Sequence, residues 1–476
     1  MSTPVFLQGS TLRHVLVMTG AATTGLVAMF AVDVVDMYFI TLLGEQQLVA
    51  AVGFSGTLLY FLLSLGIGLQ IALGALVARA EGRGDRPGAG EYCSSVLILN
   101  GIVAIFLTAL TWWNLPELLG LLGAEGQTLS YALSYTYIQL PAIPVMVLGM
   151  SLASGMRAVG DARRSMLATL YGALVNAVLD PLFIFQFGWG IEGAAWASVA
   201  SRIVVFSYAA RILFAHHRLP RAVAVGIFRR HVPAILVIAL PAVLTNLATP
   251  LGGSIVLRIM SEFGDSAVAA IAVMARLAPL AFAAVFAVSG AIGPIVAQNA
   301  GANRYDRVRQ ALLDASLFIA AYVAAIWLLL YLCLDFIITG FTASETAAEL
   351  LRFYIHFLVG AFALNGLLFV ANASFNNLGR AYLATLFNYA KVLLGIVPAA
   401  YIGAQFYGAR GVMVGEALGM ALFGVIGMLT ALGLVRRLQQ DYSPIDVIPQ
   451  PTAAAQEPAE AATDGDPTSV SVPPSR

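Results

Sequence analysis

Two aspartates stand inside apolar stretches of this sequence, where an ionisable side chain is costly. Asp36 and Asp180 each come eight residues before a glycine that ends its apolar stretch. If both stretches are helices running outward through a membrane, the helical rise places both carboxyl groups about 12 Å below the same boundary. A carboxylate inside a membrane costs about 2.5–3.5 kcal/mol on insertion scales. Two at one depth therefore indicate a functional site.

An amide and a hydroxyl are expected at similar depth. Asn176 lies one helical turn deeper than Asp180 on the same face, and Ser198 enters from the same side about 8 Å below the boundary. Two acids in a poorly hydrated site cannot both ionise cheaply, which suits a proton carrier. The same set of oxygens, as a metal site, also suits Na⁺. The alternative is structural: Asp36 and Asp180 only hydrogen-bond to polar neighbours and hold helices together.

Two further side chains are possible supporting members of this site. Asp33 lies one turn inward of Asp36 and either joins the site or faces an adjacent helix. Tyr135 comes at similar depth, where its hydroxyl could donate to Asp180. A membrane tyrosine is also a common amphipathic packing residue, so both interpretations of Tyr135 stay open.

The second half of the chain offers a different set of polar candidates. Lys391, Glu416 and Asn365 lie within its apolar stretches. Lys391 and Glu416 fall on helices that run in opposite directions, so they are expected to neutralise each other across the bundle. A buried structural ion pair and a role in transport both remain open, and Arg202 and Arg276 have the same ambiguity.

The elements that hold these residues are predicted to be membrane-spanning helices. The composition is 60% hydrophobic and 11% charged, and the mean hydropathy is +0.86, which is typical of a polytopic membrane protein. Twelve apolar runs are long enough to cross a bilayer as helices. We expect spans at residues 15–43, 48–78, 96–113, 129–152, 166–187, 194–214, 234–259, 268–296, 311–334, 347–373, 384–406 and 412–434. The fold class is an all-α polytopic membrane protein with 12 transmembrane helices.

Arginines are concentrated in every second loop. They follow the second, fourth, sixth, eighth, tenth and twelfth spans, whereas the intervening loops carry almost none. The positive-inside rule then places both termini in the cytoplasm of a multi-pass protein of the cytoplasmic (inner) membrane. After the last span, residues 441–476 are rich in Pro, Ala, Ser, Thr and acids, so we expect a disordered cytoplasmic tail.

The chain also repeats itself. Leu43-Gly44-Glu45 matches Phe263-Gly264-Asp265, the sequence ALVARAEG from Ala75 matches PIVAQNAG from Pro294, and MLATL from Met166 matches YLATL from Tyr382. We therefore expect two parallel six-helix bundles, residues 1–215 and 233–440, joined by a basic cytoplasmic loop at 216–232. Parallel six-span repeats around a cavity near the bilayer midplane are a transporter architecture.

Several motifs resemble one transporter family. They are Asp36-Met37-Tyr38-Phe39-Ile40, Gly160-Asp161-Ala162-Arg163, the run from Asn176 to Phe185, Gly193-Ala194-Ala195-Trp196, and Gln298-Asn299-Ala300-Gly301. Together they resemble the multidrug and toxic compound extrusion (MATE) family, and most closely its DinF-like and archaeal branch. The resemblance covers the chain except its tail. It implies a V of two six-helix bundles that exports organic compounds in exchange for protons or sodium.

The resemblance also bears on the site residues. In that branch, the positions matching Asp36, Asn176, Asp180 and Ser198 form the proton or cation site. Acids that other branches carry in the seventh and tenth helices appear here as Thr249 and Asn365. This difference argues against a carboxylate-based cation site in the second half.

Other classes of function fit less well. No H-E-x-x-H, G-x-S-x-G or P-loop motif is present, so an enzyme is not expected. The net charge of zero gives no case for nucleic-acid binding, and no prosthetic group is implied. We expect a monomeric antiporter whose partners are the bilayer and a cationic or amphipathic small-molecule substrate, coupled to H⁺ or Na⁺. The alternative is a lipid-linked oligosaccharide flippase of the same superfamily.

Overall fold

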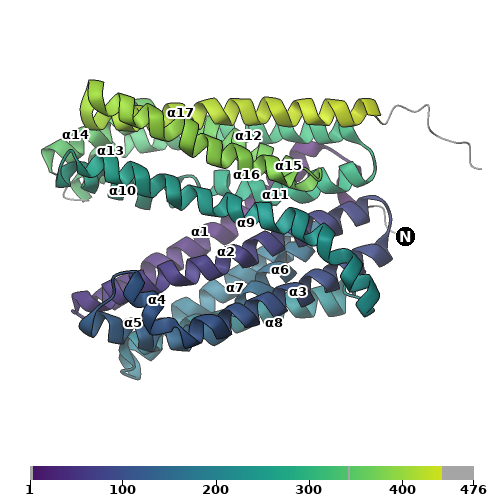
Figure 1. Ribbon diagram of the computed structural model, residues 1–476, viewed down its shortest axis with the longest axis horizontal. Coiled ribbons are helices and arrows are strands. Elements are labelled where there is room, and N and C mark those ends of the chain that lie inside the picture. The colour runs from purple at the N-terminus through teal and green to yellow at the C-terminus, as the bar shows by residue number, and fades with distance from the viewer. Residues whose placement is uncertain (1–3, 341–343, 442–476) are drawn as a thin grey trace, which may run out of the picture.

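The N-terminal half of the chain forms a bundle of helices. The computed structural model describes residues 4–340 and 344–441, and every regular element in those ranges is helical (Figure 1). The elements of this half are η1 (Val5–Leu7), α1 (Thr11–Thr41), α2 (Gln46–Gly82), α3 (Arg86–Trp113), α4 (Leu115–Leu121), α5 (Gly126–Gln139), η2 (Leu140–Ala142), α6 (Ile143–Ala158), α7 (Ala162–Pro181), η3 (Leu182–Gln186), α8 (Gly190–Ala210) and η4 (Arg211–His216).

The C-terminal half forms a second bundle. Its elements are α9 (Val225–Ser261), α10 (Asp265–Ala281), α11 (Ala283–Gly301), α12 (Tyr305–Leu332), α13 (Leu334–Gly340), α14 (Glu345–Phe353), η5 (Tyr354–Leu358), α15 (Ala361–Asn377), α16 (Ala381–Ala390), η6 (Lys391–Ile396) and α17 (Val397–Asp441). The segments η3, η4, η5 and η6 are π-helical turns.

The number of membrane crossings depends on one long helical segment. In the described residues, ten helices are long and apolar enough to span a membrane, or eleven with the bent pair Glu345–Leu358 and Ala361–Asn377. One of the ten, Ala381–Asp441, has 61 residues and would be about 90 Å long if straight. It is not straight, because Gly408 has a φ of 61° and reverses the chain. Gly403 packs on the backbone of Gly411, so the two arms are antiparallel and make two spans, giving twelve.

Three of the expected spans are interrupted. The span expected at 268–296 is divided at Phe282 into α10 and α11. The span expected at 347–373 bends by 61° between η5 and α15. The span expected at 129–152 contains the 3₁₀ turn η2, where Pro141 and Pro144 cannot donate backbone hydrogen bonds. The expected tail falls almost wholly on residues 442–476, which lie outside the described residues.

The two bundles meet at one end of the molecule. Figure 1 shows the N-terminal helices (purple to blue) and the C-terminal helices (green to yellow) close together where α1 begins and α17 ends, and farther apart toward α4, α5, α13 and α14. We call the end of the molecule where α1 begins and α17 ends the terminal end. Helix α2 packs against α9 and α11, and α1 packs against α11 and α12. These helices form most of the junction between the two halves.

Equivalent glycines of the repeat form the closest approach at the terminal end. A Cβ atom on Gly82 would lie 2.0 Å from the carbonyl oxygen of Gln298, and one on Gly301 would lie 2.2 Å from that of Arg79. Gly82 and Gly301 occupy the same place in the matching sequences ALVARAEG and PIVAQNAG. The repeat therefore produces a two-sided backbone contact between α2 and α11 that has no room for a side chain.

The N-terminal segment crosses this junction. The Phe6 backbone N–H donates to Gln298 Oε1 at 3.1 Å, and Gln298 Nε2 donates to the Ala158 carbonyl at 2.8 Å. Arg307 Nη2 donates to the Phe6 carbonyl at 3.0 Å. The chain start is thus hydrogen-bonded to α11 and α12 of the other half.

The loop between the halves is tied to the start of α7. Asp161 caps this helix by accepting from the Arg164 backbone N–H at 3.1 Å. Its carboxylate also accepts from Arg164 Nη1 at 2.8 Å and from His217 Nε2 at 2.9 Å. Partial burial raises the pKa of Asp161, but the hydrogen bonds from His217 and Arg164 outweigh it and lower the pKa to about 2.

Candidate functional site

The structure brings three of the expected site residues together in the N-terminal bundle. Asp36 lies on α1, and Asn176 and Asp180 lie one turn apart on the neighbouring α7. The amide nitrogen of Asn176 donates to Asp180 Oδ2 at 2.9 Å and to Asp36 Oδ1 at 3.4 Å. Asp180 is 0% exposed and Asn176 is 6% exposed. The amide therefore bridges two carboxyl groups in a largely dry site.

The two carboxyl groups also contact each other. Asp36 and Asp180 lie within hydrogen-bonding reach of one another, and Asp180 Oδ1 is buried without a hydrogen-bond partner in the described residues. Two ionised carboxylates in contact repel strongly when water is scarce. A proton shared between them, or a cation that both coordinate, would remove the repulsion and satisfy the unpaired oxygen. The donor set fits either H⁺ or Na⁺.

The end of α7 gives this region an irregular backbone. Pro181 is the last residue of the α-helix, and the next five residues form the π-turn η3. Single π-turns inside helices occur often at functional sites because they change the direction of the side chains around them. Here the turn begins two residues after Asp180, which places the carboxyl group at the start of a distorted segment.

Ser198 and Tyr135 are less directly involved than expected. Ser198 lies on α8 and is half-buried, but its hydroxyl makes no hydrogen bond within residues 4–340 and 344–441. Tyr135 is buried near Asp36 and Asp180, yet its hydroxyl lies beside the side chain of Gln139. Of the two interpretations left open for Tyr135, the structure therefore favours a packing residue over a donor to Asp180.

Asp33 is exposed and makes no ion pair with Arg202 in the described residues. Its carboxylate lies within electrostatic range of Asp36 and of Arg202 on α8. Arg202 in turn donates to Gln139 at the end of α5, through Nη2 to Oε1 at 2.5 Å and through Nη1 to the backbone carbonyl at 3.4 Å. Sequence reasoning missed Gln139. The available signal was its place directly before Leu140-Pro141, where a helix must break.

The polar residues of the C-terminal bundle make a looser group. Lys391 begins the π-turn η6 and is only 6% exposed. Its ammonium donates to Asn365 Oδ1 at 3.4 Å. Glu416 on α17 lies within electrostatic range of Lys391, but among the described residues the two groups are not in salt-bridge contact. The expected Lys391–Glu416 pair is thus an attraction at longer range.

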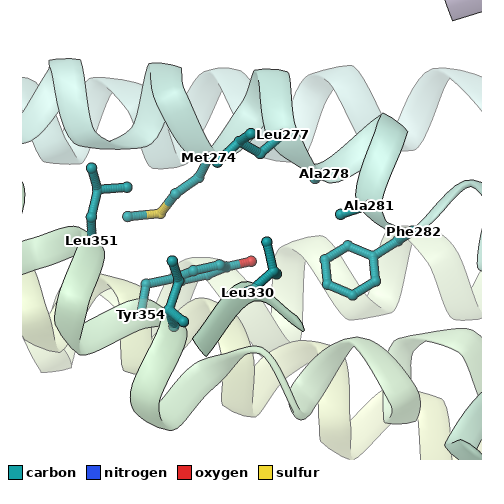
Figure 2. A pocket seen from close by; sticks show the side chains of 9 residues that line it. Met274, Leu277, Ala278, Ala281, Phe282, Leu330, Leu351 and Tyr354 are labelled. Atoms are coloured by element: carbon teal, nitrogen blue, oxygen red, sulfur yellow. The ribbon is translucent and has the colours of Figure 1, made fainter. Parts of the chain in front are cut away.

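A small apolar pocket lies elsewhere in the C-terminal bundle. Figure 2 shows it between α10 and the segments that carry Leu330, Leu351 and Tyr354, with the Tyr354 ring lying across it. Its volume is about 20 Å³, enough for about one water molecule, whereas ligand sites usually measure about 300–1,000 Å³. The described residues also hold no cluster of three or more His, Cys, Asp or Glu suited to a metal ion. The carboxyl pair therefore remains the strongest candidate site.

Comparison with known proteins agrees with this architecture. The family model described as MatE matches residues 22–182 and 241–402, which lie in the two halves of the chain. The chain belongs to the MATE family of efflux transporters. Members of this family are transporters rather than enzymes, so the protein is a multi-pass membrane transporter for small molecules.

Individual relatives cover most of this MATE protein. It is 28% identical to the FAD transporter of Shewanella oneidensis, over 84% of this chain and 90% of that protein. It is 23% identical to the multidrug export protein MepA of Staphylococcus aureus, over 86% and 91%. The flippase alternative finds no better support.

Solved structures show the same fold. The MATE transporter VcmN of Vibrio cholerae, in its bent form, matches with a TM-score of 0.86 at 24% identity, over 91% of this chain and 99% of that one. A MOP superfamily transporter from Pyrococcus furiosus matches with a TM-score of 0.85 at 23% identity, over 92% and 99%. The expected two-bundle, twelve-helix architecture is thereby confirmed.

Proposed function

We propose that this transporter exports cationic or amphipathic organic compounds by antiport, driven by H⁺ or Na⁺ that enters through Asp36, Asn176 and Asp180. The observation that carries the proposal is the contact between the half-buried Asp36 carboxyl group and the buried Asp180 carboxyl group, with one oxygen of Asp180 left unpaired. A site of this kind takes up a cation when it is reachable from the side of higher cation concentration. When the site releases that cation, the two carboxylates repel each other again.

Cation binding would act on the packing of two helices. Asp36 belongs to α1, which also contacts α11 and α12 of the other half, whereas Asp180 belongs to α7 within its own bundle. A bound cation permits α1 and α7 to lie close together, and its loss favours their separation. The charge state of the pair therefore biases the position of the helix that spans the junction. This is the differential interaction that alternating access requires.

The direction of transport follows from the arginine-rich loops. The positive-inside bias supports a cytoplasmic terminal end, so the carboxyl pair lies nearer the outside. H⁺ or Na⁺ would enter the site from the end at which the bundles are farther apart. The substrate would bind from the cytoplasm once the junction at the terminal end opens.

The relatives suggest which compounds to try first. One is an FAD transporter and another is a multidrug export protein, so flavins and cationic dyes form a reasonable first panel. The decisive experiment measures efflux of these compounds from proteoliposomes with a pH gradient and a sodium gradient imposed separately. Efflux driven by one gradient and absent in Asp36→Asn supports the proposal. Efflux that responds to neither gradient contradicts it.

A matched control uses an aspartate far from the site. Asp335 on α13 is 92% exposed and only forms a surface ion pair with Arg352, an interaction that contributes little to stability. Asp335→Asn changes the same chemical group as Asp36→Asn and should leave gradient-driven efflux intact. Equal loss in both variants would show that the effect is not specific to the carboxyl pair.

A further inference from the structure

A polar cavity lies at the terminal end, between the two halves of the chain. Arg79 and Arg83, at the end of α2, line one wall. Residues 300–303 and Tyr305, at the end of α11 and the start of α12, line the other wall. The volume of the cavity is about 640 Å³, within the range of about 300–1,000 Å³ that is usual for ligand sites. It is large enough for a small molecule or for the headgroup of a lipid.

The charge of this cavity is positive. Arg79 and Arg83 lie one helical turn apart, so they project from the same face of α2. Among the described residues, no aspartate or glutamate lines the cavity. Two guanidinium groups that share one cavity repel each other, and an anion placed between them would remove that repulsion.

The acids nearest in sequence are bonded to other partners. The carboxylate of Glu81 forms an ion pair with Arg86, and that of Asp85 accepts from the Gly88 backbone N–H at 2.9 Å, where it caps α3. Arg83 is exposed and forms no ion pair within residues 4–340 and 344–441. The positive charge of the cavity is therefore not neutralised by neighbouring side chains of α2 and α3.

The repeat does not require this charge. In the matching sequences of the two halves, Arg79 corresponds to Gln298 and Arg83 corresponds to Ala302. The side chain of Gln298 is already used, because it accepts from the Phe6 backbone N–H and donates to the Ala158 carbonyl. One wall of the cavity thus carries two arginines, whereas the equivalent positions of the other half are uncharged.

Arg79 reaches across the junction to the C-terminal half. A Cβ atom on Gly379, in the turn after α15, would lie 3.7 Å from Arg79 Nη1. Guanidinium carries five N–H donors in a planar fork, so one side chain can contact a neighbour and a ligand together. A ligand in the cavity would therefore lie against both halves of the chain.

We propose that this cavity binds the phosphate group of an anionic ligand, which then holds the two halves together at the terminal end. Phosphate oxygens match the paired donors of arginine and form short, charge-assisted hydrogen bonds with them. Basic pockets between membrane helices on the cytoplasmic side bind anionic lipid headgroups, and a soluble phosphate compound offers the same chemistry. A ligand that contacts both halves favours the form in which they are close. The inference does not rest on the proposed antiport, because binding requires no ion gradient.

The test measures phosphate binding by purified protein in a non-ionic detergent. Isothermal titration calorimetry gives the Kd of two probes, inorganic phosphate and dihexanoyl phosphatidic acid. Arg83→Gln removes one guanidinium, and we expect it to raise the Kd by about tenfold or more. Arg436→Gln, at an exposed position near the end of α17 on the same side, is the matched control and should leave the Kd unchanged. An equal effect of both variants would mean attraction to the basic surface in general and would overturn the inference.

A second pair of variants tests whether the phosphate lies between the halves. Ala302→Asp adds a carboxylate to the wall that belongs to the C-terminal half, and we expect phosphate binding to be lost although both arginines remain. Ala302→Asn adds a side chain of the same size without a charge and should bind as wild type does. Wild-type affinity in Ala302→Asp would show that the phosphate does not contact this wall, which contradicts the inference.

The two probes distinguish the sources of the phosphate. Phosphatidic acid that binds about tenfold or more tightly than inorganic phosphate, with both affinities reduced in Arg83→Gln, identifies a lipid headgroup as the ligand. Similar affinities that fall together in Arg83→Gln identify a soluble phosphate compound. If wild type binds neither probe, the inference is wrong. The proposed antiport would be unaffected by that result, because it is tested separately by efflux under imposed gradients.

Discussion

At the scale of single residues, the contact between Asp36 and Asp180 poses an electrostatic problem that a bound proton or cation solves. Asn176 cannot solve it alone, because it donates one amide group to two acceptors and leaves Asp180 Oδ1 without a partner. A purely structural pair of aspartates would be expected to have both carboxylates fully hydrogen-bonded. The unpaired oxygen favours a site that is filled and emptied during transport.

The first prediction concerns Asp36. Asp36→Asn removes one of the two carboxylates, so we expect gradient-driven efflux to fall to less than about a tenth of wild type, while the substrate still binds. Binding should lose much of its pH or Na⁺ dependence, because a cation and a substrate alter each other's affinity reciprocally. A titration of substrate binding across pH and Na⁺ measures this. Unchanged cation dependence in the variant would make Asp36 a helix-packing residue.

A second prediction compares the two bundles. In the C-terminal half, Lys391 donates a hydrogen bond to the side-chain amide oxygen of Asn365. Glu416 is the only acid near Lys391 in the described residues. We therefore expect Glu416→Gln to impair efflux several-fold less than Asp36→Asn, provided that both variants fold. Expression and thermal stability in detergent serve as controls for folding. A loss from Glu416→Gln as large as that from Asp36→Asn would place the coupling site in the other half.

The sequence could predict the carboxyl site because depth depends only on residue counts. Asp36 and Asp180 lie at equal distances from the ends of outward-running helices, and Asn176 follows from helical periodicity. The bond between Arg202 and Gln139 could not be predicted in this way. It depends on how α8 is placed beside the end of α5, which residue counts within one helix do not give. The choice between the two interpretations of Tyr135 stayed open for the same reason.

At the scale of helices, the breaks decide how the bundles meet. The turn at Gly408 falls between the spans expected at 384–406 and 412–434, whereas the break at Phe282 lies inside the span expected at 268–296, three residues after Pro279. Gly408 reverses the chain with a positive φ, so the 61-residue helical segment consists of the two antiparallel spans that were expected. The repeat showed that Gly82 and Gly301 are equivalent. It did not show that α2 and α11 touch at those positions, because a repeat gives no information about the relative placement of its two copies.

A third prediction tests that contact. Gly82→Ala would place a Cβ atom 2.0 Å from the Gln298 carbonyl, so the two bundles must move apart or strain locally. We expect a loss of about 1–3 kcal/mol in stability of this closed form, seen as a lower Tm in detergent. Gly56→Ala on the same helix is the matched control, because a Cβ atom at Gly56 would meet nothing within 4 Å. If Gly82→Ala is as stable as Gly56→Ala, the contact does not define the junction.

A fourth prediction concerns the loop between the halves and pH. The pKa of Asp161 is about 2 in the folded protein against an ordinary value of 3.8. Its contribution to the free energy of unfolding is therefore fully present above about pH 4 and is lost as the pH falls toward 2. Asp161→Asn should cost at most about 2 kcal/mol at neutral pH. The difference in Tm from wild type should vanish near pH 2. Asp306→Asn, at an exposed surface pair, should show no such pH dependence.

At the scale of the whole molecule, three segments far apart in the sequence lie at the terminal end. Val5 packs against Gly160, the neighbouring Asp161 binds His217 of the loop between the halves, and α17 ends on the same side (Figure 1). Whichever side of the membrane this end occupies, the chain start, the loop and the end of α17 share it. An even number of spans requires the same result.

The last prediction assigns that side. The arginine-rich loops follow every even-numbered span and include residues 218–230, so the positive-inside rule places the terminal end in the cytoplasm. Single cysteines introduced in this loop or just after residue 441, in a background without Cys93 and Cys333, should react with a membrane-impermeant maleimide only after the cells are opened. A cysteine at Glu117 on α4, which Figure 1 places at the opposite end, should react in intact cells. Labelling of the 218–230 loop from outside would invert the orientation, and H⁺ or Na⁺ would then have to reach the carboxyl pair from the cytoplasm.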